Sequence, residues 1–204
     1  IGVRLVGSEM CIRDSSERTM CTFLGIAGKI NENDIAEDAV KNSDMIFLEG
    51  YLWDEGDPKK AFDKAINNAK QVSMSLSDKF CVDRHKPHFL NLVKNKLDIT
   101  FANEEEITSL IDAKNFQDII EFGKKIKKNL VITRGAKGAV SINNNLVSEI
   151  EISNNLNVID LTGAGDLFAA GYLHGFINKF SQQDCLKKGT ELASKVIQQI
   201  GARL

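Results

Sequence analysis

The sequence lacks both an excess of positive charge and long apolar runs. Its 26 lysines and arginines are outnumbered by 28 aspartates and glutamates, which gives a formal net charge of −2. Nucleic acids and anionic membranes attract proteins through clustered positive charge, and this composition offers no support for such a partner. No apolar run reaches the roughly 18 residues that a membrane-spanning helix needs. We therefore expect a small-molecule partner, with no nucleic acid and no membrane, and we leave the oligomeric state open.

Cysteine and proline are scarce. The two prolines mark no linker. His85 and His88 lie three positions apart near Asp83, and their polar context predicts an exposed helix entry rather than a metal site. The four cysteines lack the CxxC or CxxH spacing of a zinc or redox site, and with no targeting signal in sight we expect them to be reduced packing residues of a cytoplasmic protein: Cys11, Cys21, Cys81 and Cys185.

What the sequence does contain is a regular alternation of elements. With 204 residues and 43% hydrophobic content, it can form one large domain, or one with a small appendage. From Met45 onward, short apolar strands alternate with amphipathic helices, which is typical of a parallel α/β sheet. We expect strands at 45–50, 71–76, 97–103 and 130–133, helices at 58–70, 86–96 and 115–129, a loop at 134–139, and two edge segments around 143–145. A last strand is expected at 157–160, before a helix that begins near Gly165.

A glycine-rich turn precedes that last helix, in the string DLTGAGDLFAAGYLHGF at 160–176. Gly163 and Gly165 carry no Cβ, so an anion can approach their backbone N–H groups, and the helix dipole adds to the attraction. Asp166 falls in the first turn of the helix, where an ionised carboxylate is favoured and can orient a hydroxyl or take its proton. The alternative is that Asp166 only caps the helix, and spacing alone does not decide between the two.

Two familiar phosphate-binding patterns are absent. No GxxxxGK[ST] occurs, which excludes a P-loop. The turn reads GxGxxF at 163–168 instead of GxGxxG, and no second βαβ unit follows it, which argues against a dinucleotide site and an oxidoreductase.

The turn instead resembles the second signature of the ribokinase-like (PfkB) family of carbohydrate and nucleoside kinases, D-x-[TS]-G-A-G-D before an apolar helix. In that family the Gly-Ala-Gly backbone forms an anion hole for the transferring phosphate, and the last aspartate is the catalytic base. The resemblance assigns the anion hole to Gly163, Ala164 and Gly165 and the base to Asp166. It implies ATP and Mg²⁺ as cofactors. The positions that match are Asp160, Thr162, Gly163, Ala164, Gly165 and Asp166, with Thr162 among the nucleotide-binding residues.

Two further segments follow the order of the family. NEEE at 103–106 is similar to its N-x-x-E motif, which implies that Asn103 and Glu106 help to position magnesium and phosphate, largely through water. The alternative for this segment is an acidic helix start. VITRGAKGA at 131–139 is similar to its nucleotide loop, with an ordinary glycine turn as the alternative. The resemblance places four residues of this loop near the ATP phosphates and ribose: Thr133, Arg134, Gly135 and Gly138.

The resemblance is strongest to the bacterial adenosine kinase branch, in ERTMCTFLGIAGKI, LEGYLWD and LSDKFCVDRHKPHFLNLV. It implies that Phe80 packs against the purine and that Arg18 lies in the strand leading to a substrate lid. We expect a three-layer α/β/α fold with a mainly parallel sheet, in which the N-terminal part and most of the lid are missing. The expected organisation is a non-native leader at 1–15, a lid segment at 16–32, and the C-terminal part of the kinase domain with its nucleotide site at 33–204.

The predicted function is transfer of the ATP γ-phosphate to the 5′-hydroxyl of adenosine. The alternatives are a sugar kinase of the same family, acting on ribose or fructose, and a non-catalytic nucleotide-binding fragment. Whether the chain is active in this form is left open, because the family's sugar-binding residues lie mainly in the segment that we expect to be missing.

Overall fold

The structure is a computed structural model that describes residues 7–12, 18–53, 57–152 and 155–204, with the backbone alone for 7–12 and 18–23. Its residues group into two compact units. One contains the N-terminal hairpin with residues 133–141 and 148–204, and the other contains residues 25–132 and 142–147.

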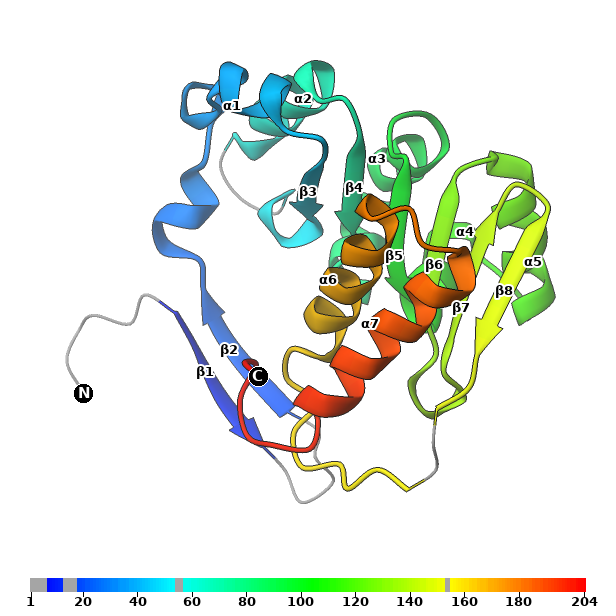
Figure 1. Ribbon diagram of the computed structural model, residues 1–204. Coiled ribbons are helices and arrows are strands. Elements are labelled where there is room, and N and C mark those ends of the chain that lie inside the picture. Colours follow the sequence, from blue (N-terminus) through cyan, green and yellow to red (C-terminus); the bar gives the residue numbers. More distant parts are fainter. Residues whose placement is uncertain (1–6, 13–17, 54–56, 153–154) are drawn as a thin grey trace. The chain divides into compact units, whose positions relative to one another are not determined.

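Six strands hydrogen-bond in the order β3-β4-β5-β6-β7-β8. The pairs β3–β4 and β4–β5 are parallel, and their crossover segments carry α2 and α3, so the expected α/β class with a mainly parallel sheet is confirmed (Figure 1). A separate antiparallel hairpin pairs β1 (Gly7–Ile12) with β2 (Arg18–Phe23). The six strands of the sheet are β3 (Ile46–Glu49), β4 (Val72–Ser75), β5 (Ile99–Asn103), β6 (Asn129–Thr133), β7 (Ala139–Asn143) and β8 (Leu146–Ile150).

The helices follow the predicted alternation. The expected start of the first large one is confirmed, because Asp57 is its N-cap and Pro58 occupies its first position. None of the helices in the described ranges is long and apolar enough to cross a membrane. The helices are α1 (Glu37–Asn42), α2 (Pro58–Asn68), α3 (Lys79–Asn95), α4 (Glu104–Ile111), α5 (Phe116–Ile126), α6 (Ala164–Ile177) and α7 (Gln182–Val196), with short 3₁₀ turns η1 (Gly25–Lys29), η2 (Glu32–Asp34), η3 (Gly50–Trp53) and η4 (Gly135–Lys137).

Helix α3 is longer than predicted. It begins at Lys79 rather than at 86, because the Asp78 carboxylate caps it by accepting a hydrogen bond from the Cys81 N–H at 2.7 Å. Pro87 lies inside the helix, and the backbone at His85 leaves helical geometry there (φ −116°, ψ 19°). The kink at His85 divides α3 into two helical stretches, so the expected helix entry at this point is present, and the first stretch, from Lys79, is the part that the sequence analysis missed.

The predicted strand at 157–160 does not form. The N–H groups of Ile159 and Asp160 both donate to the Ile197 carbonyl oxygen, at 2.8 and 3.2 Å, and not to a neighbouring strand. Helix α6 then begins at Ala164, one residue before the predicted Gly165. Residues 157–160 are thus held by the end of α7.

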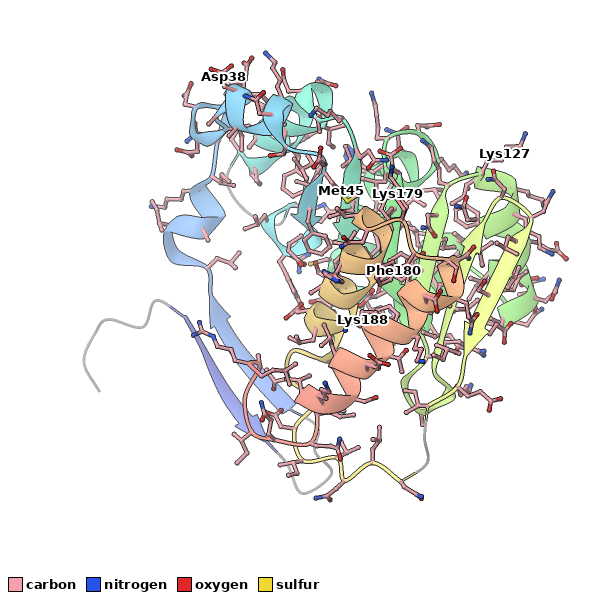
Figure 2. The ribbon with its side chains drawn as sticks, in the orientation of Figure 1. Asp38, Met45, Lys127, Lys179, Phe180 and Lys188 are labelled. Carbon is pink, nitrogen blue, oxygen red and sulfur yellow. The ribbon has the colours of Figure 1, made fainter. Side chains whose placement is uncertain are left out.

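Helices α6 and α7 lie side by side in one unit and approach closely (Figure 1). A Cβ on Gly171 would lie 2.6 Å from the Lys188 carbonyl oxygen, on the stretch of α7 marked by Lys188 in Figure 2. A Cβ on Gly189 would lie 2.7 Å from the Phe168 carbonyl oxygen. The glycines therefore allow backbone contact between the two helices.

The predicted boundaries at 15/16 and 32/33 stay predictions. Residues 1–6 and 13–17 lie outside the described residues, and 7–12 form the first strand of the hairpin.

Candidate active site

The turn before α6 is built around a buried carboxylate. Asp160 is 0% exposed, and its Oδ1 accepts hydrogen bonds from the Thr162 N–H at 2.9 Å and the Thr162 hydroxyl at 2.6 Å. Its Oδ2 accepts a hydrogen bond from the Gly201 N–H at 2.9 Å. Asp160 therefore fixes the path of the backbone that leads into the helix.

The N-terminus of α6 has no side-chain cap. Gly163 is its N-cap with φ 79°, a left-handed conformation that suits glycine, and no side chain caps the helix. Among the described residues, no atom accepts a hydrogen bond from the N–H of Gly165 or of Asp166. Open donors and a helix dipole are features that an anion site requires, and the predicted site itself stays a prediction.

The Asp166 carboxylate lies in the first turn of α6 and is exposed. No hydrogen bond or ion pair engages it within the described parts of the chain, so it does not act as a helix cap. Of the two interpretations left open by the sequence, the geometry favours a carboxylate that is available to a ligand.

A cavity of about 570 Å³ adjoins this turn within the same unit. It brings together the turn residues Ala164 and Gly165 with the predicted loop residues Thr133, Gly135 and Gly138. Its other walls are mainly apolar, which suits the flat face of an aromatic ring system. The remaining lining residues are Ala136, Ala139, Ile152, Leu156, Val158, Leu161, Phe168, Thr190, Ala193, Ser194 and Ile197.

The loop after β6 is a tight glycine turn. The Arg134 N–H donates to the Gly138 carbonyl oxygen at 2.8 Å, and Gly138 has φ 90°. A Cβ at Gly138 would lie 1.8 Å from the Ile150 carbonyl oxygen, so no other residue fits there. Arg134 lines a second, more polar cavity of about 380 Å³ instead of the first, together with Lys137, Glu149 and others.

Asn103 and Glu106 come together at the start of α4, in the other unit. Asn103 accepts from the Glu106 N–H at 2.8 Å, while the Glu106 carboxylate accepts from the Asn103 N–H at 2.9 Å and from its side-chain amide at 2.7 Å. This is a capping box, so the alternative of an acidic helix start describes the geometry as well.

Glu106 is nonetheless an unusual cap, because it is 5% exposed. Burial is the largest cause that raises the pKa of its carboxyl, the Asn103 backbone hydrogen bond lowers it, and the charges of Asp78, Glu105 and Glu49 raise it, so that the net pKa is about 7. Four acids thus gather near the carboxyl ends of β3, β4 and β5, where a cation would relieve their repulsion. No group of three His, Cys, Asp or Glu side chains arranged to hold a metal ion by themselves occurs among the described residues.

Of the two residues predicted to contact the acceptor, Phe80 lines neither of the two cavities above. Phe80 is 77% exposed at the start of α3. Arg18 belongs to β2, and its side chain lies outside what the structure describes.

The sequence analysis missed the contribution of α7 to the first cavity. Thr190, Ala193, Ser194 and Ile197 all line it. Their spacing of three, four and seven positions is that of one helix face, so the periodicity could have identified them as a set. The Thr190 hydroxyl oxygen is buried and has no hydrogen-bond partner within the described residues.

Comparison with known proteins places this geometry in a family. The chain is similar to the crystal structure of adenosine kinase from Sinorhizobium meliloti, with 35% identity and a TM-score of 0.92 over 97% of this chain and 62% of that one. It is also similar to a probable sugar kinase from Rhizobium etli CFN 42, with 36% identity and a TM-score of 0.90 over 96% of this chain and 61% of that one. Ribokinase from Thermotoga maritima, at 16% identity and a TM-score of 0.76 over 96% of this chain and 64% of that one, shares the fold.

The chain therefore has the ribokinase-like α/β fold and spans about three fifths of the length of these three proteins. The sequence profile of the pfkB family carbohydrate kinases matches residues 5–204. Together these similarities confirm the resemblance found in the glycine turn, and the chain belongs to the pfkB family of carbohydrate kinases.

Proposed function

We propose that the protein is an ATP-dependent kinase that transfers the γ-phosphate to the 5′-hydroxyl of adenosine. The observation that carries this proposal is the start of α6, where unpaired N–H groups and the exposed Asp166 carboxylate adjoin a cavity of about 570 Å³ in one unit. The apolar walls suit the adenine of ATP, and the open helix N-terminus suits its phosphates.

Asp166 is proposed as the base, and Gly163 to Gly165 as the anion hole. The acceptor hydroxyl gives its proton to Asp166 while its oxygen forms a bond to the γ-phosphorus. The bond from that phosphorus to the β–γ bridging oxygen breaks, and ADP leaves with the electron pair. Because the transition state is loose, the chain contributes chiefly by aligning the two oxygens and by offering N–H donors to the developing charge.

The residues that would hold Mg²⁺ are Asn103 and Glu106, through water. The fit is supported by chemistry: Glu106 is a buried carboxyl whose pKa is raised to about 7 with other acids nearby, and Mg²⁺ prefers oxygen ligands and keeps several waters. When bound, the ion would neutralise charge on the phosphate oxygens.

Adenosine is favoured over a sugar as acceptor by the name of the Sinorhizobium meliloti protein and by the exposed Phe80, which is free to stack on a purine. A sugar kinase is the second candidate, because the Rhizobium etli protein of almost equal identity is named a probable sugar kinase. A non-catalytic nucleotide-binding fragment is the third.

The test is ATP-dependent phosphorylation of adenosine, ribose and fructose by the 204-residue chain and by the longest chain that its gene encodes. Turnover of adenosine that is lost in Asp166→Asn supports the whole proposal. Turnover of a sugar keeps the mechanism and moves the acceptor to the second candidate. Tight binding of Mg-ATP with no turnover of any acceptor by the longer chain would make the protein a nucleotide-binding module.

A further inference from the structure

The second, more polar cavity shares part of its wall with the first. Its volume of about 380 Å³ lies in the range of about 300–1,000 Å³ that small-molecule sites occupy. Ala136, Ala139 and Ile152 line both cavities. All the residues that line the second cavity belong to the same unit as the first. The two cavities are therefore neighbours, and a change in one wall is felt in both.

Two stretches of the chain line the second cavity. One is residues 134–140, the loop after β6 with the start of β7, and the other is residues 149–152, the end of β8 with the two residues after it. The stretches meet at Gly138, where a Cβ would lie 1.8 Å from the Ile150 carbonyl oxygen. A ligand in the cavity would therefore touch the loop and the strand end together.

The charges in this cavity are separated between the two stretches. Both cations, Arg134 and Lys137, come from the loop. Both acids, Glu149 and Glu151, come from the strand end. Within the described residues, no ion pair engages Lys137 or either glutamate, although the opposite charges line one cavity. A ligand with an anionic end and a cationic end would pair with both stretches at once.

We propose that the second cavity is a regulatory site for a small zwitterion, whose carboxylate pairs with the two cations of the loop and whose ammonium group pairs with the two glutamates. The guanidinium of Arg134 offers a planar pair of donors that matches a carboxylate, and an ammonium group has three donors to share between two acids. Lys137, Glu149 and Glu151 are exposed, so water and salt screen their charges. We expect a Kd on the order of 1 mM that rises with salt concentration.

Occupancy of this site changes the affinity of the first cavity through the shared wall. A zwitterion that bridges the loop and the strand end orders Ala136, Ala139 and Ile152, so a ligand of the first cavity has less of its wall left to order. This part of the inference rests on the proposed function, because it takes that ligand to be ATP. The coupling is reciprocal, and we expect each ligand to strengthen binding of the other about fivefold.

The site is tested with γ-aminobutyrate as the probe, and with butyrate and butylamine as controls that carry one charge each. NMR follows three amides of the protein during each titration: Val140 lines only the second cavity, Ser194 only the first, and Ala136 both. We expect γ-aminobutyrate to shift the amides of Val140 and Ala136 most, with saturation. Equal shifts from either control, no saturable shift, or a shift confined to Ser194 would overturn the site.

The double variant Glu149→Gln/Glu151→Gln tests the two acids. Its matched control is Glu191→Gln, which changes an exposed acid of α7 that lines neither cavity. We expect the double variant to bind γ-aminobutyrate about tenfold more weakly, and the control to bind it like the native protein. Without the probe, both variants should have the native Kd for ATP. Native affinity for the probe in the double variant would show that the two glutamates do not hold the ammonium group.

The coupling is measured as the Kd for ATP with and without saturating γ-aminobutyrate. We expect the probe to lower this Kd about fivefold in the native protein and to leave it unchanged in the double variant, at the same probe concentration. If the probe binds but leaves the Kd for ATP unchanged in the native protein, the cavity has no regulatory role. If the probe binds as expected but the protein phosphorylates no acceptor, the proposed function fails and the zwitterion site stands.

Discussion

The starts of α4 and α6 use acidic residues in opposite ways. At α4 the Asn103 and Glu106 side chains fill the helix N-terminus, and the carboxylate is buried in hydrogen bonds to backbone and amide. At α6 a glycine occupies the cap position, the N–H groups of Gly165 and Asp166 have no acceptor among the described residues, and the Asp166 side chain is exposed. Both helices carry an acid in the first turn, yet only α6 leaves backbone N–H donors at its N-terminus without a side-chain cap.

The difference teaches that the cap residue, and not the acid, decides whether the backbone N–H groups of a helix N-terminus are available to an anion. An asparagine cap uses the orphan donors, whereas a glycine cap in the left-handed conformation leaves them available. The predictions below test this contrast, from the largest expected effect to the smallest.

Asp166→Asn removes the proposed base without changing the volume of the side chain. We expect kcat to fall about 10³-fold, the range of general-base catalysis, with the free energy of unfolding within about 0.5 kcal/mol of the native protein, because the residue is exposed and unpaired. Steady-state kinetics and urea unfolding measure the two quantities. A loss of stability with little loss of kcat would mean that the acid of α6 is a cap like that of α4.

Glu106 makes stability depend on pH. Its pKa is raised from 4.5 to about 7 in the folded chain, so between these values the folded state holds a proton that the unfolded state has released. The free energy of unfolding should therefore fall as pH rises through this window, by on the order of 3 kcal/mol.

Urea unfolding at pH 4.5, 6 and 7.5 measures this dependence. Glu106→Gln should remove most of it, and Glu104→Gln in the same turn should leave it in place. Added Mg²⁺ should release a proton from the native chain near pH 6, because a cation favours the ionised carboxylate. If both variants show the same pH dependence, Glu106 is not the source of the pH dependence of stability.

Gly163→Ala and Gly165→Ala separate shape from function at α6. The first forces alanine into φ 79° and brings its Cβ to 2.7 Å from the Ala202 Cβ, so we expect a loss of about 1–3 kcal/mol in the free energy of unfolding. The second meets no atom within 4 Å and should stabilise the helix by about 0.8 kcal/mol.

Despite its stability, Gly165→Ala places a methyl group beside the open N–H donors and should weaken kcat/KM for ATP about tenfold. Thermal unfolding and kinetics on both variants check the pair. If Gly165→Ala has the kinetics of the native protein, the phosphate does not bind at this turn.

Asn115→Ala gives the smallest effect. Asn115 and Asp118 form an exposed capping box on α5 with the same pattern as the box on α4. We expect a loss of about 1 kcal/mol and no change in kcat, whereas Asn103→Ala should cost a similar amount of stability and also lower kcat. If the two variants have equal kcat values, the capping box of α4 only stabilises the helix and takes no part in the reaction.

The sequence predicted the main elements well where local signals were strong. Asp57 and Pro58 mark the start of α2, and strands β3, β4 and β5 lie inside their predicted ranges. The prediction of a strand at 157–160 was wrong because two of its N–H groups donate to the Ile197 carbonyl oxygen. That contact spans 37 or more residues, and no local pattern encodes it.

The candidate site was predicted only in part, because local signals can be read from the sequence and long-range contacts cannot. The glycine turn and the loop at 133–138 carry local backbone signals, and the structure brings them to one cavity. The α7 wall has only an ordinary helical period, and the role of Asp160 depends on Gly201, which a reading of the turn alone does not reach.

The close pairing of α6 and α7 has a consequence for the order of folding. Only residues 178–181 separate the two helices, so their contacts have low contact order and cost little loop-closure entropy. We therefore expect this helical hairpin to form early, before the long-range contact between Asp160 and Gly201. The wall that is proposed to receive the nucleotide base would then exist before the turn that is proposed to hold the phosphate, and nucleotide present during synthesis would favour the last step of folding.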